Sequence, residues 1–230
     1  HSQYELQCLK DYEHSVLALG SISRYEMLNF NSKFKQSEKI LFCLGPDVNF
    51  NFRQLLNFYS SNKKYNASSD VLSLVSDQSL SLDIKLHPAG EVNSYFFYKK
   101  LIHENKYKNI NPIYGNFGEL IARKYKIIIF DYLASALVNF ILTLNICVII
   151  YNQDFEKLLI NEEVKEDLRQ RCYIAKNKKE LKYLLIQYKK GKLQSKWSDY
   201  FINKYVFPLD NSNPGVEIAN YINSIVKAPN

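Results

Sequence analysis

The chain lacks the glycine patterns that many nucleotide-binding folds carry. It has only 7 glycines in 230 residues, and no G-x-G-x-x-G follows its first apolar strand-like segment. That absence disfavours a dinucleotide cofactor, because the motif brings the backbone close to a pyrophosphate. A P-loop, a Gly-x-Ser-x-Gly elbow and a His-Glu-x-x-His pair are also missing. None of the enzyme classes that use these motifs is indicated.

Cysteine pairs and long apolar runs are lacking too. The four cysteines are Cys8, Cys43, Cys147 and Cys172. None of them belongs to a C-x-x-C pair, and three of them lie in apolar strand-like runs. They are expected to be reduced thiols of a cytosolic protein. The most apolar stretch, 127–151, is interrupted by Asp131, Asn139 and Asn145, which argues against a membrane span. No secretory signal peptide is recognisable, so a cytoplasmic location is expected.

What the chain has is positive charge. Its net charge of +7 favours an anionic partner: nucleic acid, an anionic membrane surface or a phosphorylated substrate. The chain has no RNP-like, zinc-finger or basic-zipper pattern, so no nucleic-acid partner is expected. The lysine pairs are isolated and are interpreted mostly as solvated helix faces: Lys63-Lys64, Lys99-Lys100, Lys178-Lys179 and Lys189-Lys190.

Strand-like and helix-like segments alternate along the chain. Apolar runs predict strands at 39–45, 82–88, 110–114, 126–131, 145–151 and 172–175. Helical spacing predicts helices at 51–60, 94–104, 117–124, 134–144, 155–169, 178–188, 196–206 and 215–226. Residues 60–80, rich in Ser, Asn and Asp, are predicted to form a loop.

This order predicts an α/β fold, a Rossmann-like parallel sheet of about six strands with helices on both faces. The expected domain covers residues 38–190. An N-terminal segment or linker, 3–35, precedes it. A C-terminal helical tail, 192–228, is expected to pack on it.

The strand at 82–88 ends in chemically useful residues. Leu82, Ile84 and Leu86 alternate, Lys85 lies on the opposite face, and His87 and Pro88 follow at the tip. Ligands of open α/β sheets bind outside the carboxyl ends of the strands, so this cationic tip suits a nucleotide phosphate. The alternative is that His87 is an ordinary loop histidine.

A second candidate follows the strand at 126–131. Asp131 ends that strand, and Ser135 lies where a helix is expected to begin. The free N–H groups of a first helical turn bind phosphate well, and a serine hydroxyl adds another donor. Asp131 or Ser135 could instead merely cap the helix.

Residues 83–225 resemble the C-terminal, donor-binding half of GT-B glycosyltransferases of bacterial surface-carbohydrate biosynthesis. Three stretches carry the resemblance: Lys-Leu-His-Pro (85–88), Gly-Glu-Leu-Ile-Ala-Arg-Lys-Tyr-Lys-Ile-Ile-Ile-Phe-Asp-Tyr-Leu-Ala-Ser-Ala (118–136) and Leu-Asn-Ile-Cys-Val-Ile-Ile-Tyr-Asn-Gln-Asp (144–154). The match is similar to surface-polysaccharide transferases, and more distantly to CDP-glycerol glycerophosphotransferases and bacterial sialyl- and Kdo-transferases. The chain departs from the pattern in Ala134-Ser135-Ala136, where relatives often carry a Ser/Thr pair or Gly-Thr, and in Cys147, where many have proline.

The resemblance implies roles for particular residues. His87 would be the catalytic contact to the donor phosphate, with Lys85 and Pro88 beside it. Asp131 and Ser135 would complete the phosphate site. Glu119 would reach a ribose hydroxyl, or else serve as a partner of its helix dipole.

The resemblance further implies metal-independent sugar transfer from a nucleotide-activated donor, most simply a CMP-linked one, with no cofactor. The acceptor would be a bacterial surface glycan or its lipid-linked precursor, and the facing acceptor domain would supply the general base. Lys189–Lys192, with Trp197 and Tyr200, would touch an anionic membrane at its inner face or form a turn before a helix packed on the domain. A non-catalytic Rossmann-like interaction module is the alternative function.

Overall fold

The computed structural model describes residues 37–45, 61–87, 91–113, 125–133, 145–158, 160–198, 200, 204 and 213–226. The sheet and the helices that cover it belong to one compact unit, whose last residue is Trp197. The amphipathic helix α10 (Pro214–Val226) belongs to a second unit.

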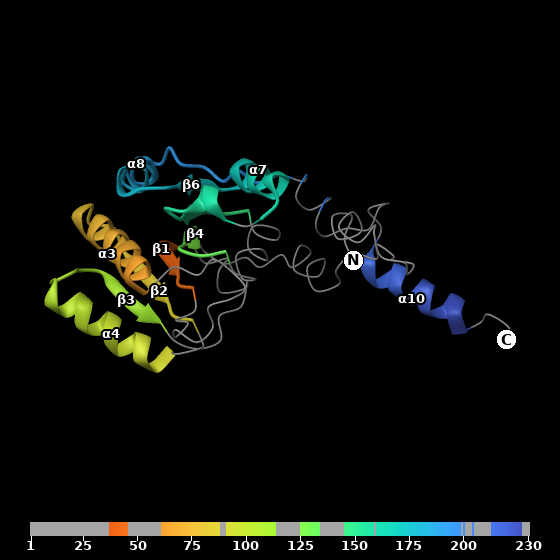
Figure 1. The fold of residues 1–230 in the computed structure, drawn as a ribbon, viewed down its shortest axis with the longest axis horizontal. Coiled ribbons are helices and arrows are strands. Elements are labelled where there is room, and N and C mark those ends of the chain that lie inside the picture. Colours follow the sequence, from red (N-terminus) through yellow and green to blue (C-terminus); the bar gives the residue numbers. More distant parts are fainter. Residues whose placement is uncertain are drawn as a thin grey trace. The chain divides into compact units, whose positions relative to one another are not determined.

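A six-stranded parallel sheet forms the centre of the first unit (Figure 1). Its strands are β1 (Ser37–Cys43), β2 (Leu82–Lys85), β3 (Ile110–Ile113), β4 (Tyr125–Phe130), β5 (Cys147–Tyr151) and β6 (Tyr173–Ala175). They lie in the order β3-β2-β1-β4-β5-β6, and each neighbouring pair is parallel. This is the strand order of a Rossmann sheet, so the predicted fold class is confirmed.

The described helices of this unit follow β1, β2, β5 and β6. They are α3 (Ser61–Asp77), α4 (Glu91–Glu104), the 3-10 turn η1 (Phe155–Lys157), α7 (Glu162–Arg171) and α8 (Lys178–Lys189). Three of them, α3, α4 and α8, bury apolar side chains in one core with a single face of the sheet. In Figure 1, α3 lies between α4 and α8.

The central strands are apolar on both faces, as expected for a parallel sheet covered on each side. Ile127 and Ile129 of β4 belong to the core under α3 and α8, and Ile128 between them is equally inaccessible to solvent. On the second face of β2, two charged residues are buried as well. One of them, Asp83, accepts hydrogen bonds from Tyr125 Oη (2.9 Å) and Lys39 Nζ (3.1 Å).

Asparagine side chains cap the N-termini of two helices, α7 and α8. Asn161 Oδ1 accepts the N–H of Glu163 at the start of α7, and Asn177 Oδ1 accepts the N–H of Glu180 at the start of α8. Glu180 in turn accepts a hydrogen bond from the N–H of Lys176 (2.7 Å). This reciprocal capping fixes the point where the chain leaves β6.

The prediction of a loop at 60–80 is wrong, because residues 61–77 form α3. The Ser, Asn and Asp residues that suggested a loop lie mostly on or near its solvent side. The buried positions are spaced as on one helix face: Ala67, Ser68, Val71, Leu72, Leu74 and Val75. Packing of this apolar stripe against the sheet outweighs the weak helix propensity of the polar residues.

Smaller differences concern element limits. The strand at 82–88 ends at Lys85, and the helix predicted at 155–169 is divided into η1 and α7. Residues 196–198, which were predicted to begin a helix, are not helical.

The predicted domain limits stay predictions. Several predicted elements lie wholly outside the described residues: 3–35, 51–60, 117–124 and 134–144.

We predict that Leu72→Ala lowers the free energy of unfolding by about 2–5 kcal/mol, because Leu72 is fully buried between α3 and the sheet. Asn66→Ala, at an exposed position of the same helix, is the matched control and should change stability by less than about 0.5 kcal/mol. Urea unfolding followed by circular dichroism measures both. Equal effects of the two substitutions would contradict the placement of α3.

Candidate functional site

The sheet order places a candidate site where β1 and β4 lie side by side. From β1 the chain builds the sheet outward to β2 and β3, and then returns to β4 on the other side of β1. In open α/β sheets a crevice forms at this switch point, outside the carboxyl ends of the strands. Gly45 and Asp131, which follow β1 and β4, lie at that edge.

A hydrogen bond joins these two residues directly. The backbone N–H of Gly45 donates to Oδ1 of Asp131 at 2.7 Å, and Asp131 is only 2% exposed. The carbonyl of Gly45 accepts a hydrogen bond from Lys64 Nζ of α3 at 2.6 Å. Asp131, directly after β4, thus binds the N–H of Gly45, and Lys64 of α3 binds its carbonyl.

Gly45 also has to be glycine on packing grounds. A Cβ atom at this position would lie 2.7 Å from Cβ of Tyr132 and 2.9 Å from its Cγ. The Cβ atom is fixed by the backbone, so rotation of the tyrosine side chain cannot relieve the shorter of these two contacts. The glycine therefore permits the close approach of the chain after β1 to the chain after β4.

Two opposite charges lie near the thiol of Cys43 at the end of β1. Lys85 pairs with Cys43 in the β1–β2 register, and Cys43 pairs with Phe130, the residue before Asp131. Burial raises the pKa of the Cys43 thiol, the charge of Asp131 raises it further, and Lys85 lowers it. Cys43 is therefore a neutral thiol and no nucleophile at physiological pH.

The buried lysine of β2 does not extend into solvent. Lys85 is 8% exposed, and its Nζ donates a hydrogen bond to the carbonyl of Leu86 at 2.5 Å. His87, two residues past the end of β2, is half-buried at the same edge of the sheet. Of the two, His87 has the greater access to a ligand.

The structure thus brings three of the six sequence-predicted site residues to one edge of the sheet: Lys85, His87 and Asp131. The other three, Pro88, Glu119 and Ser135, lie outside the described residues. The site roles of all six stay predictions.

The sequence interpretation missed the first turn of α3. Lys64 contacts Gly45, and Lys63 forms an ion pair with Asp154, which follows β5. Lys157 also contacts Asp154, at 3.1 Å, and the hydrogen bonds from these two lysines lower the pKa of the Asp154 carboxyl. The interpretation of the Lys63-Lys64 pair as a solvated helix face is incomplete: Lys63 is half-exposed, but both side chains bond residues at the carboxyl edge of the sheet.

The remaining described cysteines are also inert. Cys147 and Cys172 are buried free thiols, and burial raises the pKa of each to about 12. The prediction of reduced core thiols is confirmed for these two and for Cys43, and Cys8 lies outside the described residues.

The segment after α8, up to Trp197, packs within the first unit. Lys196 Nζ donates to the carbonyls of Arg169 (2.9 Å) and Cys172 (3.2 Å), and the guanidinium of the fully buried Arg171 lies over the Trp197 ring. These contacts favour the packed alternative for Trp197 over contact with a membrane. Within the described part of the chain, no helix has the length and apolar character to cross a bilayer.

Metal ligands are not gathered at this edge. In the described ranges, no three His, Cys, Asp or Glu side chains are grouped so that they could hold a metal ion. The polar groups that these ranges do bring to the edge include the carboxylates of Asp131 and Asp154, several lysines and a histidine. Such a set can bind and orient an anion.

Comparison with known proteins shows the fold and nothing finer. No family model matches the chain, and no curated protein matches it by sequence. The structure of Methanocaldococcus jannaschii UDP-GlcNAc 2-epimerase, in complex with UDP-GlcNAc and UDP, is similar with a TM-score of 0.55 and 14% identity. The match covers 95% of this chain and 57% of the epimerase. The fold is Rossmann-like and of the GT-B half type.

The solution structure of ALG13 also matches, over 80% of this chain and 95% of that one. Its identity is 12% and its TM-score is 0.46, which is too low to establish a shared fold.

We predict that Gly45→Ala lowers the free energy of unfolding by about 1–3 kcal/mol, because its Cβ would overlap the base of the Tyr132 side chain. In a Tyr132→Gly background, which removes the overlapping atoms, the same substitution should cost less than about 1 kcal/mol. The double-mutant cycle is measured by urea unfolding. An equal cost in both backgrounds would show that the close approach does not constrain residue 45.

Proposed function

We propose that this chain is the donor-binding half of a nucleotide-sugar-dependent, metal-independent glycosyltransferase of the GT-B type. The observation that carries the proposal is the β1–β4 switch point of a Rossmann-like sheet, where Gly45 bonds Asp131 and where His87 follows the neighbouring strand β2 at the same carboxyl edge. The similar epimerase was solved with UDP-GlcNAc and UDP, which supports a nucleotide sugar as the ligand class.

The electrostatics of this edge suit a diphosphate or monophosphate at its rim rather than deep in the crevice. The buried carboxylate of Asp131 would repel a phosphate placed against Gly45, whose N–H it already occupies. His87, half-buried beyond β2, can donate to a phosphate oxygen, with the charge of Lys85 two residues behind it. Ser135 and Pro88 would complete the contact, as the family resemblance implies.

The chemistry asked of these residues is stabilisation of the departing nucleotide. When the glycosidic C–O bond to the phosphate breaks, negative charge grows on the phosphate oxygens. A positioned donor such as His87 is worth about 3 kcal/mol in this role, because it needs no reorganisation as the charge develops. The acceptor hydroxyl must also lose its proton, and a base on a facing acceptor half would take it.

That acceptor half would lie outside the residues described here or on another chain. The chain spans 57% of the length of the epimerase that it matches. As finer parts of the proposal, the donor carries CMP, the acceptor is a bacterial surface glycan or its lipid-linked precursor, and Glu119 reaches the ribose. The enzyme would work in the cytoplasm, in peripheral contact with the inner face of the membrane, without a cofactor and without binding nucleic acid.

One observation favours the second candidate, a non-catalytic Rossmann-like interaction module. Three polar groups at the switch point already bond within the protein: the N–H of Gly45, Lys64 Nζ and Lys85 Nζ. A scaffold that has lost its ligand would keep such internal bonds.

Calorimetric titration of CMP, CDP, UDP and GDP separates the two candidates. We predict that one nucleotide binds selectively, and that His87→Ala weakens its binding by roughly tenfold or more, because a hydrogen bond to a charged phosphate is lost. Lys182→Ala, which removes an exposed cation from α8, is the control and should leave binding unchanged.

Failure of all four nucleotides to bind at millimolar concentration would favour the interaction module. Binding that is equal for all four and falls steeply with salt would instead indicate a nonspecific polyanion surface.

A further inference from the structure

The helix α8 has an outward face that is cationic along its length. Its inner face packs into the core through Leu181, Leu184 and Leu185, and Figure 1 shows the helix at the margin of its layer, with α3 beside it. The residues on the opposite side of the helix follow helical spacing and are mostly basic: Lys179, Lys182, Tyr183, Ile186 and Lys190. These five residues are called the α8 face below.

The lysines of α8 have two kinds of surroundings. On the flank beside α3, Lys178 Nζ pairs with Asp70 (2.9 Å), and Lys189 Nζ donates to a backbone carbonyl just after α3 (2.6 Å). Their sequence neighbours Lys179 and Lys190 are exposed, and neither ammonium group has a partner within the described part of the chain. The lysines of the α3 flank therefore serve packing between the helices, and those of the α8 face are presented to solvent.

Helix stability does not account for Lys179. This residue lies in the first turn of α8, where the partial positive charge of the helix terminus disfavours a cation. Lys178 lies in the same turn, but Asp70 compensates its charge. Glu180, the acidic residue of that turn, accepts the backbone N–H of Lys176 (2.7 Å) as part of the cap. An exposed cation that opposes the helix dipole is a reason to look for an anionic partner outside the fold.

Apolar side chains lie between the lysines of the α8 face. Tyr183 is 61% exposed, and Ile186 is partly exposed. Lysines that flank an aromatic ring suit the surface of an anionic bilayer, where ammonium groups reach lipid phosphates and the ring lies among the headgroups. The α8 face itself contains no Arg, Asn or Gln, the side chains that most often recognise bases, so it is less suited to a nucleic acid.

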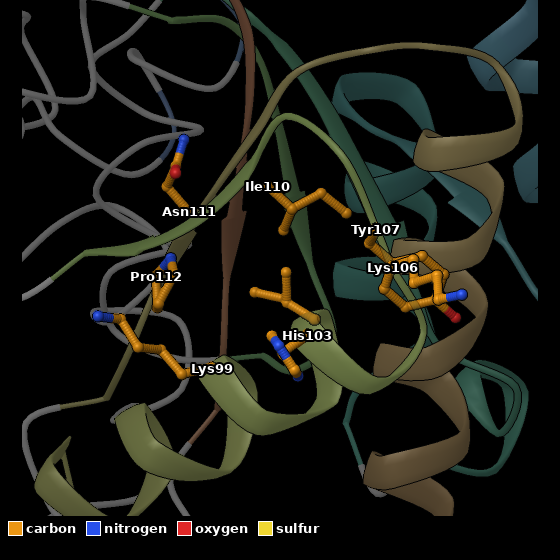
Figure 2. Close-up of a pocket in the computed structure, with 8 residues that line it drawn as sticks. Lys99, His103, Lys106, Tyr107, Ile110, Asn111 and Pro112 are labelled. Atoms are coloured by element: carbon orange, nitrogen blue, oxygen red, sulfur yellow. The ribbon is translucent and has the colours of Figure 1, made fainter.

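The basic residues beside α4 form no comparable face. A cavity of about 550 Å³ between α4 and β3 has Lys99 and Lys106 in its wall, and Figure 2 shows these two side chains at opposite ends of it, pointing apart. Lys99 Nζ lies 4.8 Å from the centre of the Tyr95 ring. Lys100 pairs with Glu104 (3.7 Å). Of these two helices, α8 is the one whose lysines share a single exposed face.

We infer that the α8 face lies on an anionic membrane surface, with its lysines at the lipid phosphates and the Tyr183 ring among the headgroups. The choice of a membrane rests on the proposed function, in which the acceptor is a lipid-linked glycan precursor. Because α8 begins after the carboxyl end of β6, a bilayer along this face extends to the side of the sheet where the donor site is proposed. Trp197, which packs on Arg171, takes no part in the contact.

Cosedimentation of the full chain with lipid vesicles tests the inference. Vesicles of phosphatidylcholine with about one-third phosphatidylglycerol are compared with vesicles of phosphatidylcholine alone. Each lysine near an anionic surface raises partitioning roughly fivefold, so the three lysines of the α8 face predict roughly a hundredfold preference for the anionic vesicles. Raising the ionic strength to about 0.5 M should remove most of this preference, because the Debye length shortens.

Lys179→Glu separates membrane binding from folding. It places an anion in the first turn of α8, which the helix dipole favours, so the thermal midpoint should stay at or above that of the parent chain. Partitioning into anionic vesicles should fall roughly 25-fold, because the charge of the face changes by two.

A pair of double variants gives a matched control. Lys179→Ala with Lys190→Ala should weaken partitioning roughly 25-fold, because two lysines of the α8 face are lost. Lys178→Ala with Lys189→Ala makes the same charge change on the α3 flank and should weaken it by less than about threefold. The thermal midpoint of each variant is measured alongside.

Three results would overturn the inference. They are equal binding to neutral and anionic vesicles, equal losses in the two double variants, and tighter binding to a DNA duplex than to anionic vesicles at equal phosphate concentration. The vesicle assay contains no nucleotide, so the two proposals can fail separately. A chain that binds anionic vesicles but none of the four nucleotides would contradict the donor site alone, and one that binds a nucleotide but no vesicle would contradict the α8 face alone.

Discussion

The architecture of the carboxyl edge depends on the hydrogen bond between the Gly45 N–H and the Asp131 carboxylate. A carboxylate that is 2% exposed is stable as an anion only where donors compensate for its lost hydration. The N–H of Gly45 is one such donor, at 2.7 Å. The bond joins the ends of two strands, because Gly45 and Asp131 are 86 residues apart in sequence. Tyr132 then packs against Gly45 so closely that no side chain fits there. The geometry of the switch point follows from this one contact.

The same bond limits the chemistry that the edge can perform. In a dinucleotide-binding fold the amides after the first strand accept a pyrophosphate, but here a carboxylate takes that place beside Gly45. The positive charges of Lys64 and Lys85 lie near it and bond backbone carbonyls. An anionic ligand is therefore expected at the rim, near His87, which agrees with a transferase that stabilises a departing phosphate without a metal.

The sequence predicted the sheet well because the strands are apolar on both faces and need no partner to be recognised. Ile127–Phe130 and Cys147–Ile150 are examples, and they occupy adjacent places in the sheet. The helix α3 was missed, since its polar residues hide a stripe of which Val71, Leu72 and Val75 are the clearest members. The stripe can be recognised as one face of a helix only once the sheet that packs against it is known.

For the predicted site the structure describes the positions of Lys85, His87 and Asp131, and their roles stay predictions. Asp131 was recognisable at a strand end, but its partner Gly45 could not be foreseen, because the contact depends on which strand lies next to β4. The same holds for Lys63 and Asp154, which are 91 residues apart in sequence.

Mapping where a nucleotide binds would test the proposed donor site at the β1–β4 edge. Amide resonances of the labelled chain, followed during titration with CMP and UDP, report the site without reference to activity. If the donor binds at the β1–β4 edge, the shifts will be concentrated at Gly45, His87 and Asp131, at the carboxyl ends of β1, β2 and β4. Shifts confined to residues away from this edge, or none at millimolar nucleotide, would contradict a donor site there.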